Sequence, residues 1–236
     1  MTMNTSDSKT YIIAGASSGI GLELARILVN TNIVYGISRT PGELQYHENY
    51  RHLPYDFLTG EKLPDISANA DGLIYCPGSI TLKPFERLSV TDIDNDFTIN
   101  AKGAFTFIQK YKGNIKNSPN ASILLFSSVA VQTGLPYHIS IAMAKGAVEG
   151  LTRALAAELS PTVRVNAIAP SLTDTPLASV LLNSEAKIEA NKQRHPLKNI
   201  GSPQEIALFS HHLLTQSTWI TGQIFGINGG MGTIIK

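Results

Sequence analysis

Short apolar runs that alternate with longer amphipathic stretches constrain the fold of this chain more than any other feature. Six runs rich in β-branched and other apolar residues are predicted to be buried strands, at 11–16, 32–38, 72–76, 122–127, 163–169 and 223–228. Helical patterns separate most of them, at 20–30, 90–115, 142–160 and 202–215. Repeated strand–helix–strand units imply right-handed crossovers and a parallel sheet. The sequence therefore predicts a doubly wound, Rossmann-type α/β sheet of about seven mostly parallel strands with helices on both faces.

The stretch from 40 to 70 departs from this alternation. Pro41, Pro54 and Pro64 leave little room for full-length helices between the neighbouring runs. We expect abbreviated turns there, around a short strand near 51–57.

Composition limits the domain organisation and the possible partners. The 236 residues, 43% hydrophobic and 16% charged, suit a single domain spanning 1–236. Lys and Arg number 19 against 18 Asp and Glu, so the net charge of +1 gives no electrostatic reason to expect nucleic acid or a membrane surface as a partner. We expect a small-molecule substrate.

The single cysteine and the polar start indicate the compartment. Cys76 has no partner for an internal disulfide, and there is no Cys cluster to hold zinc, so we expect a reducing cytoplasm and no metal. Residues 1–9 are polar and predicted to be flexible, with no apolar signal segment behind them. No window approaches the roughly 20 apolar residues of a membrane span.

A glycine-rich segment at 14–21, AGASSGIG, lies where the first strand turns into a helix. Gly15, Gly19 and Gly21 would let a pyrophosphate approach the backbone N–H groups and the positive helix end, with Ser17, Ser18 and Ile20 completing the turn. A tight packing turn is the alternative. The strand before it and the helix after it favour a dinucleotide site.

The glycine spacing, G-x-x-x-G-x-G, resembles that of the short-chain dehydrogenase/reductase family, and further matches follow in order along nearly the whole chain. The short length resembles the family's single-domain branch, whose members mostly interconvert alcohols and carbonyls. The resemblance implies that Asp56 and Phe57 flank the adenine ring and that Asn100, Ser128 and Lys145 lie at the reactive centre. It also implies a nicotinamide-binding segment from Pro170 to Thr175 that includes Thr173, and a C-terminal signature at 220–231.

The end of the second strand indicates which cofactor is bound. NAD-specific relatives place a carboxylate there, whereas this chain has Ser38 followed by Arg39. An arginine pairs with a 2′-phosphate through forked, charge-assisted hydrogen bonds, so NADP(H) is predicted. The alternative is that Arg39 is a solvated loop residue. The basic residue that many NADP(H) relatives carry before the middle glycine is replaced by Ser18, although Ser17 and Ser18 could donate their hydroxyls.

Two departures from the family pattern stand out. The usual Asn-Asn-Ala-Gly after the fourth strand is Tyr75-Cys76-Pro77-Gly78, which we interpret as substituted packing, with Cys76 and Gly78 still expected beside the cofactor. The second departure affects the chemistry. The family's catalytic tyrosine stands four residues before the lysine, and that position is Ile141.

Isoleucine cannot donate a proton, so the roles around it change. The resemblance implies that Lys145 binds the nicotinamide ribose, that Ser128 hydrogen-bonds a substrate oxygen and that Asn100 holds a water. A surface position for Lys145 is the alternative interpretation. His138 and Tyr137 flank the Ile141 position if the helix begins early enough.

His138 is the better candidate proton donor because its reference pKa lies near 6.5. Its alternative is a helix-start histidine bonded to backbone. The remaining histidines show no grouping with carboxylates and are interpreted as surface or loop residues: His47, His52, His195, His211 and His212.

Two functions from different classes follow. One is an NADP(H)-dependent carbonyl reductase or alcohol dehydrogenase with a non-standard proton donor; the other is a cofactor-binding protein with little or no turnover, acting as a sensor or silent subunit. Residues 177–200 are expected to cover the substrate, either as an apolar lid or as a packed amphipathic helix. The Ala- and Gly-rich helix at 142–160 predicts a homo-oligomer, with a tetramer favoured.

Overall fold

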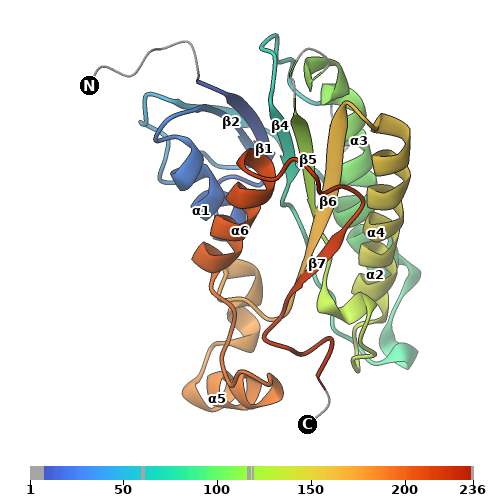
Figure 1. Cartoon of the computed structure of the whole chain (residues 1–236). Coiled ribbons are helices and arrows are strands. Elements are labelled where there is room, and N and C mark those ends of the chain that lie inside the picture. The colour runs from blue at the N-terminus through green and yellow to red at the C-terminus, as the bar shows by residue number, and fades with distance from the viewer. Residues whose placement is uncertain (1–7, 60–61, 116–117, 119, 235–236) are drawn as a thin grey trace.

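Seven parallel strands form one sheet in the order β3-β2-β1-β4-β5-β6-β7 (Figure 1). The computed structural model describes residues 8–59, 62–115, 118 and 120–234. The fold predicted from the sequence is confirmed, including the short strand expected near 51–57. The strands are β1 (Thr10–Ala14), β2 (Ile33–Ser38), β3 (Tyr50–Pro54), β4 (Gly72–Tyr75), β5 (Ala121–Phe126), β6 (Val163–Pro170) and β7 (Ile224–Ile227).

Helices cover both faces of the sheet (Figure 1). On one face α1 (Gly19–Leu28) and α6 (Pro203–Thr215) pack together over a core that includes Leu24, Leu28 and Ile206. On the other face α3 (Gly103–Tyr111) and α4 (Ile139–Leu159) pack over a second core, and α2 (Val90–Phe97) packs against α4. The buried faces of α1, α3, α4 and α6 follow the apolar spacing of the sequence.

The helical stretch at 90–115 is interrupted. A π-helical turn, η3 (Thr98–Lys102), separates α2 from α3, and a 3₁₀ turn, η4 (Lys112–Ile115), follows α3. A π turn releases backbone groups from the regular α-helical ladder and often occurs at functional sites. Here it contains Asn100, which is fully buried.

The expected substrate-covering segment, 177–200, is largely helical. It contains most of η6 (Pro176–Leu181) and all of α5 (Glu185–Arg194), which lie beyond the carboxyl ends of the strands (Figure 1). Two other short 3₁₀ turns are η2 (Phe85–Arg87) and η5 (Val129–Val131). Most of the expected flexible start, residues 1–7, lies outside the described residues, and the Lys9 N–H already donates to Asn32 Oδ1 at 3.2 Å.

The direction of chain winding reverses between β1 and β4. From β1 the chain proceeds to β2 and β3 on one side, and from β4 it proceeds to β5, β6 and β7 on the other. In parallel α/β sheets such a reversal opens a crevice at the carboxyl ends of the strands, where ligands bind.

Candidate active site

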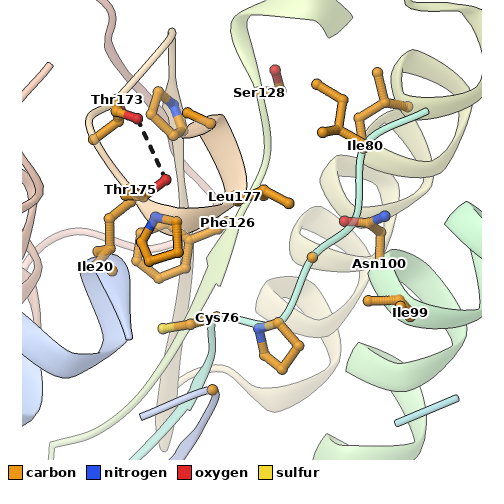
Figure 2. A pocket seen from close by; sticks show the side chains of 18 of the residues that line it. Ile20, Cys76, Ile80, Ile99, Asn100, Phe126, Ser128, Thr173, Thr175 and Leu177 are labelled. Atoms are coloured by element: carbon orange, nitrogen blue, oxygen red, sulfur yellow. Dashed lines mark hydrogen bonds between the residues drawn. The ribbon is translucent and has the colours of Figure 1, made fainter. Parts of the chain in front are cut away.

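A pocket of about 420 Å³ occupies this crevice (Figure 2). Residues that follow each of the first six strands line it, from Gly15 after β1 to Pro170 at the end of β6. In Figure 2, Thr173, Thr175 and Ile20 lie on one side and Ser128, Ile80 and Asn100 on the other. The pocket brings together every site residue expected from the sequence: Gly15, Ser17, Ser18, Gly19, Ile20, Gly21, Ser38, Arg39, Asp56, Phe57, Cys76, Gly78, Asn100, Ser128, His138, Lys145, Pro170, Thr173 and Thr175.

The glycine turn forms one end of the pocket. Gly15 and Gly19 have φ angles of +76° and +56°, which residues with side chains rarely adopt. A Cβ added at Gly21 would lie 2.2 Å from the Gly15 carbonyl oxygen, so no side chain fits there. Ser18, at the start of α1, makes no capping bond with its side chain. The first turn of α1 therefore presents backbone N–H groups and a free hydroxyl to an anion.

Ser38 and Arg39 differ in whether their side chains are free to bond to a ligand. Ser38 is buried and its hydroxyl donates to the Thr40 carbonyl at 2.8 Å, which uses its only hydrogen. Arg39 is exposed at the pocket and takes part in none of the ion pairs among the described residues. Of the two residues, Arg39 is the one that can reach a phosphate in the pocket.

Asp56 and Phe57 follow β3 at the same end. The Asp56 Oδ1 accepts the Leu58 N–H at 3.0 Å. The Phe57 ring makes edge-to-face contacts with Tyr55 and Tyr75, with centroids 4.9 and 5.1 Å apart. Phe57 therefore joins the pocket wall to the core beneath it.

Tyr75 braces the π turn. Its hydroxyl donates to the Ile99 carbonyl at 2.5 Å, and a Cβ added at Gly103 would lie 2.1 Å from the same hydroxyl. The substitution interpreted as packing thus also supplies a hydrogen bond to a carbonyl within η3. Beside it, burial raises the pKa of the Cys76 thiol to about 12, so this thiol is a poor nucleophile at neutral pH.

Asn100 points from the π turn into the pocket (Figure 2). Its Nδ2 donates to the Asp96 carbonyl at 2.8 Å and to Ser79 Oγ at 3.2 Å, which fixes the orientation of the amide because a carbonyl can only accept. Its Oδ1 is buried without a partner in the structure. A buried acceptor of this kind requires a donor, from water, a ligand or a neighbouring ammonium.

Lys145 lies on α4 and is only 8% exposed. Its Nζ donates to the Phe126 carbonyl at 2.8 Å, which leaves two N–H groups for other partners. Burial lowers the pKa of Lys145 to about 8, while the Cys76 thiol and the Asp96 carboxylate oppose that shift. Lys145 is therefore a pocket residue and not a surface lysine.

Ile141 occupies the position, four residues before Lys145, where the resemblance leads us to expect a tyrosine. It is 3% exposed and lines the pocket one helical turn before Lys145. Ser128, across from it at the start of η5, accepts the Ala130 N–H at 3.2 Å through its hydroxyl oxygen. The Ser128 hydrogen remains available to a ligand.

Of the two candidate proton donors, only His138 lines the pocket. Its Nδ1 contacts the Pro136 carbonyl at 2.6 Å, so the backbone bond considered as its alternative role exists and sets Nδ1 as the donor. Its Nε2 is left for another partner. Tyr137 is 56% exposed, has a φ of +68° and is absent from the pocket lining.

His195, expected to be a surface or loop residue, lies in the loop directly after α5 but is buried there and not on the surface. It is 2% exposed and lines the pocket, with Nδ1 2.8 Å from the Asn191 carbonyl and Nε2 2.9 Å from Ser171 Oγ. Its burial arises because the chain after α5 folds back over the segment that follows β6, a long-range contact that no local pattern announces. Sequence reasoning also missed part of the apolar lining, namely Ile80, Leu82 and Leu135, whereas Leu177 and Leu181 belong to the segment expected to cover the substrate.

Two kinds of site are not found among residues 8–59, 62–115, 118 and 120–234. No group of three or more His, Cys, Asp or Glu side chains is placed to hold a metal ion. Over the same residues, no helix has the length and apolar character needed to cross a membrane.

Comparisons with known proteins show which family this chain is similar to. A family model described as Enoyl-(Acyl carrier protein) reductase matches residues 61–232. The 3-oxoacyl-(acyl-carrier-protein) reductase FabG of Thermotoga maritima is 30% identical over 95% of this chain and 98% of its own length. A tropinone reductase homologue of Arabidopsis thaliana is 34% identical over 94% and 91%.

Solved structures show the same fold. A short chain dehydrogenase family protein from Francisella tularensis superimposes with a TM-score of 0.86 at 24% identity, covering 95% of this chain and 98% of that one. The Pseudomonas aeruginosa RhlG/NADP active-site complex gives a TM-score of 0.85 at 23% identity, with coverages of 98% and 100%.

Proposed function

Because the chain belongs to the short-chain dehydrogenase/reductase family, we propose that it is an NADP(H)-dependent oxidoreductase that interconverts a carbonyl and an alcohol. The observation that carries the proposal is the continuity of the pocket. One cavity joins the glycine turn and Arg39 at one end to Ser128, Asn100 and Lys145 at the other. A dinucleotide bound along it would have its phosphates at the turn and its nicotinamide near the polar cluster.

The residues present fit such a cofactor. The N-terminus of α1 would bind the pyrophosphate, Arg39 the 2′-phosphate, and the free N–H groups of Lys145 the nicotinamide ribose. The segment from Pro170 to Thr175 would contact the nicotinamide. When bound, this group supplies or accepts the hydride at the substrate carbon. RhlG, a structural neighbour, has been solved with NADP.

The chain's own residues would handle the substrate oxygen and the proton. The free Ser128 hydroxyl would donate a hydrogen bond to the carbonyl oxygen. His138 would donate the proton through Nε2, and since Nδ1 is committed to the Pro136 carbonyl, only the imidazolium form can do so.

The substrate is inferred to carry an apolar group next to its reacting carbon. Ile80, Leu135, Ile141, Leu177 and Met231 line the same pocket as Ser128 and Lys145. Apolar walls around a few convergent polar groups are typical of sites that orient a small organic substrate. An apolar ketone or the corresponding secondary alcohol fits this lining.

A second function is supported by Ile141. Isoleucine has no hydroxyl, so the buried Ile141 cannot donate the proton that a tyrosine would donate at this position. A protein that binds NADP(H) with little turnover, as a sensor or silent subunit, would tolerate this change.

Calorimetry with NADPH and NADH, followed by nicotinamide absorbance with a panel of apolar ketones and secondary alcohols, tests both functions. The proposed enzyme should bind NADPH and consume it with at least one ketone. Tight NADPH binding without consumption across the panel would favour the silent-subunit function, and failure to bind either cofactor would contradict both.

The chain is also proposed to assemble as a homo-oligomer, with a tetramer favoured. Large apolar side chains are exposed on α2, α3 and α4, including Val90, Phe97, Phe105 and Met143. Isologous pairing of such helices would bury them. Light scattering at micromolar concentration should report a mass above that of the 25.4 kDa chain, and a monomer would contradict the proposal.

A further inference from the structure

Two acidic side chains are buried among the described residues, Asp96 at 1% and Glu149 at 4% exposure. Buried carboxylates are costly unless hydrogen bonds and an opposite charge compensate them. Glu149 has both, because Ser127 Oγ donates to it at 2.9 Å and Arg153 pairs with it at 3.0 Å. Asp96 has hydrogen bonds but no direct ion pair in this part of the chain.

The hydrogen bonds of Asp96 lead toward the reactive end of the pocket. Its carboxylate accepts Ser79 Oγ at 2.6 Å and the Thr81 N–H at 3.2 Å. Asn100 Nδ2 lies 3.2 Å from the same Ser79 hydroxyl and also bonds to the Asp96 backbone carbonyl. The acid, the serine and the asparagine therefore form one connected, buried network.

Gly78 connects this network to Lys145. A Cβ added at Gly78 would lie 3.1 Å from Asn100 Oδ1 and 3.7 Å from Lys145 Nζ, so the unpartnered oxygen and the amine both border this glycine. Two cationic side chains are buried among the described residues, Lys145 and Arg164, and Arg164 bonds to the carbonyls of Leu213 and Leu214 on the opposite face of the sheet. Lys145 is thus the buried cation on the side of Asp96.

We propose that Asp96 is the buried counter-charge of Lys145, a positioning residue that holds the lysine as an ammonium in a site that lacks the family's tyrosine. The functional consequence of this proposal rests on the proposed function. A charged Lys145 would bind the ribose hydroxyls of the cofactor and stabilise negative charge on a substrate oxygen, and both interactions would be weaker with a neutral amine. The direction in which Asp96 acts on the pKa of Lys145 agrees with this role.

Other ionisable groups around Lys145 are accounted for. Cys76 faces it from the end of β4, and His138 lines the same pocket at the start of α4. Among the elements packed against α4, β5 and η5 carry no charged side chain, and Arg164 of β6 is committed to α6. The remaining charged groups are exposed or paired with other residues: Lys102 of η3, Asp92 and Asp94 of α2, and Glu149, Arg153 and Glu158 of α4.

The test measures the charge state of Lys145 without cofactor or substrate. Competitive acylation with acetic anhydride, read by mass spectrometry of the peptide containing Lys145 over a range of pH, reports the fraction present as free amine. Asp96→Asn should raise that fraction at pH 7 by about fivefold, from about 9% to about 50%, the effect of a one-unit fall from a pKa of about 8. Asp94→Asn removes the same charge from an exposed position on the same helix and should leave the profile unchanged.

Two further variants separate charge from structure. Asp96→Glu retains the charge and should keep the unmutated profile, whereas Ser79→Ala removes a hydrogen bond without removing the charge and should shift it little. If Asp96→Asn does not fold, Asp96→Ser provides a second neutral variant with room for water.

An unchanged Lys145 profile in a folded neutral variant would overturn the proposal, as would an equal shift in Asp94→Asn. NADPH affinity, measured separately on the unmutated protein, decides the proposed function independently of this result.

Discussion

At the glycine-turn end of the pocket the chain has the glycine spacing expected of the family, whereas at the α4 end the position expected to hold a tyrosine is Ile141. Gly15, Gly19 and Gly21 have conformations or clearances that exclude side chains. Near Lys145, by contrast, the buried Ile141 occupies the position where we expect a tyrosine.

The difference follows from what each end must do. Binding a pyrophosphate depends on backbone N–H groups, so the sequence needs only glycines at the positions where a side chain would block the pyrophosphate. Proton transfer depends on one side chain with a suitable pKa at one place, and that requirement can be met from a different position.

The largest expected effect falls at the α4 end. His138→Ala should lower the rate of reduction of a cognate ketone by about 10²- to 10⁴-fold, because the proton donor is lost, while NADPH affinity stays nearly unchanged. Steady-state kinetics and calorimetry measure the two quantities. Tyr137→Phe, an exposed neighbour, is the control and should matter little. A normal rate in His138→Ala would remove His138 from the mechanism.

The burial of Lys145 should appear in the pH dependence of stability. Its pKa is lowered to about 8 in the folded protein from the ordinary 10.5. Between these two pH values Lys145 is mostly neutral in the folded protein and mostly protonated in the unfolded chain. The free-energy cost of burying the charged lysine is therefore largest below about pH 8 and decreases as the pH rises. From pH 8 to 9.5 the free energy of unfolding of the unmutated protein should therefore gain on that of Lys145→Met by about 1–2 kcal/mol.

Denaturant titrations of both proteins at several pH values measure this gain. Restricting the comparison to values below pH 10 limits the contribution of Tyr11 and Tyr50, whose pKa values burial raises to about 12. Parallel pH profiles for the two proteins would show that Lys145 titrates normally.

A smaller effect is expected at the glycine-turn end. NADPH should bind at least about tenfold more tightly than NADH, or about 1.4 kcal/mol, and Arg39→Ala should erase most of the difference. Calorimetry with both cofactors measures it, and Arg87→Ala, an exposed arginine away from the pocket, is the matched control. Equal affinities for NADPH and NADH in the unmutated protein would contradict the assignment of Arg39.

The smallest effect is expected from restoring the family's residue. Ile141→Tyr should place a phenol beside Ser128 and Lys145 and raise turnover of generic ketones by a few-fold, roughly 1 kcal/mol in the barrier. Ile141→Phe introduces a ring of nearly the volume of tyrosine but without the hydroxyl, and it should give no gain in turnover. If both variants behave alike, the departure at 141 concerns packing and not catalysis.

Much of this architecture followed from local signals. The six apolar runs became strands β1, β2 and β4 to β7, and the proline-rich stretch contributed only the short β3. These elements were predictable because buried parallel strands leave continuous apolar runs and glycine turns leave fixed spacings. The pocket likewise gathered the expected residues, because the carboxyl ends of parallel strands meet at one edge.

The interruption of the helical stretch at 90–115 was not visible in advance. The π turn at Thr98–Lys102 is stabilised from outside by the Tyr75 hydroxyl, which comes from β4. This stabilising contact comes from a residue distant in sequence, so the local pattern at 90–115 does not reveal it.

By itself, the sequence determined the order of strands and helices, the place of the glycine turn and the isoleucine four residues before Lys145, because each depends on residue type at neighbouring positions. Only the tertiary structure decided that His195 is buried against Ser171, that His138 reaches the pocket while Tyr137 does not, and that Asp96 is buried and bonded to Ser79. Those outcomes depend on burial and on contacts between distant segments, and these set the pKa and the hydrogen-bond partners of a side chain without leaving a local pattern.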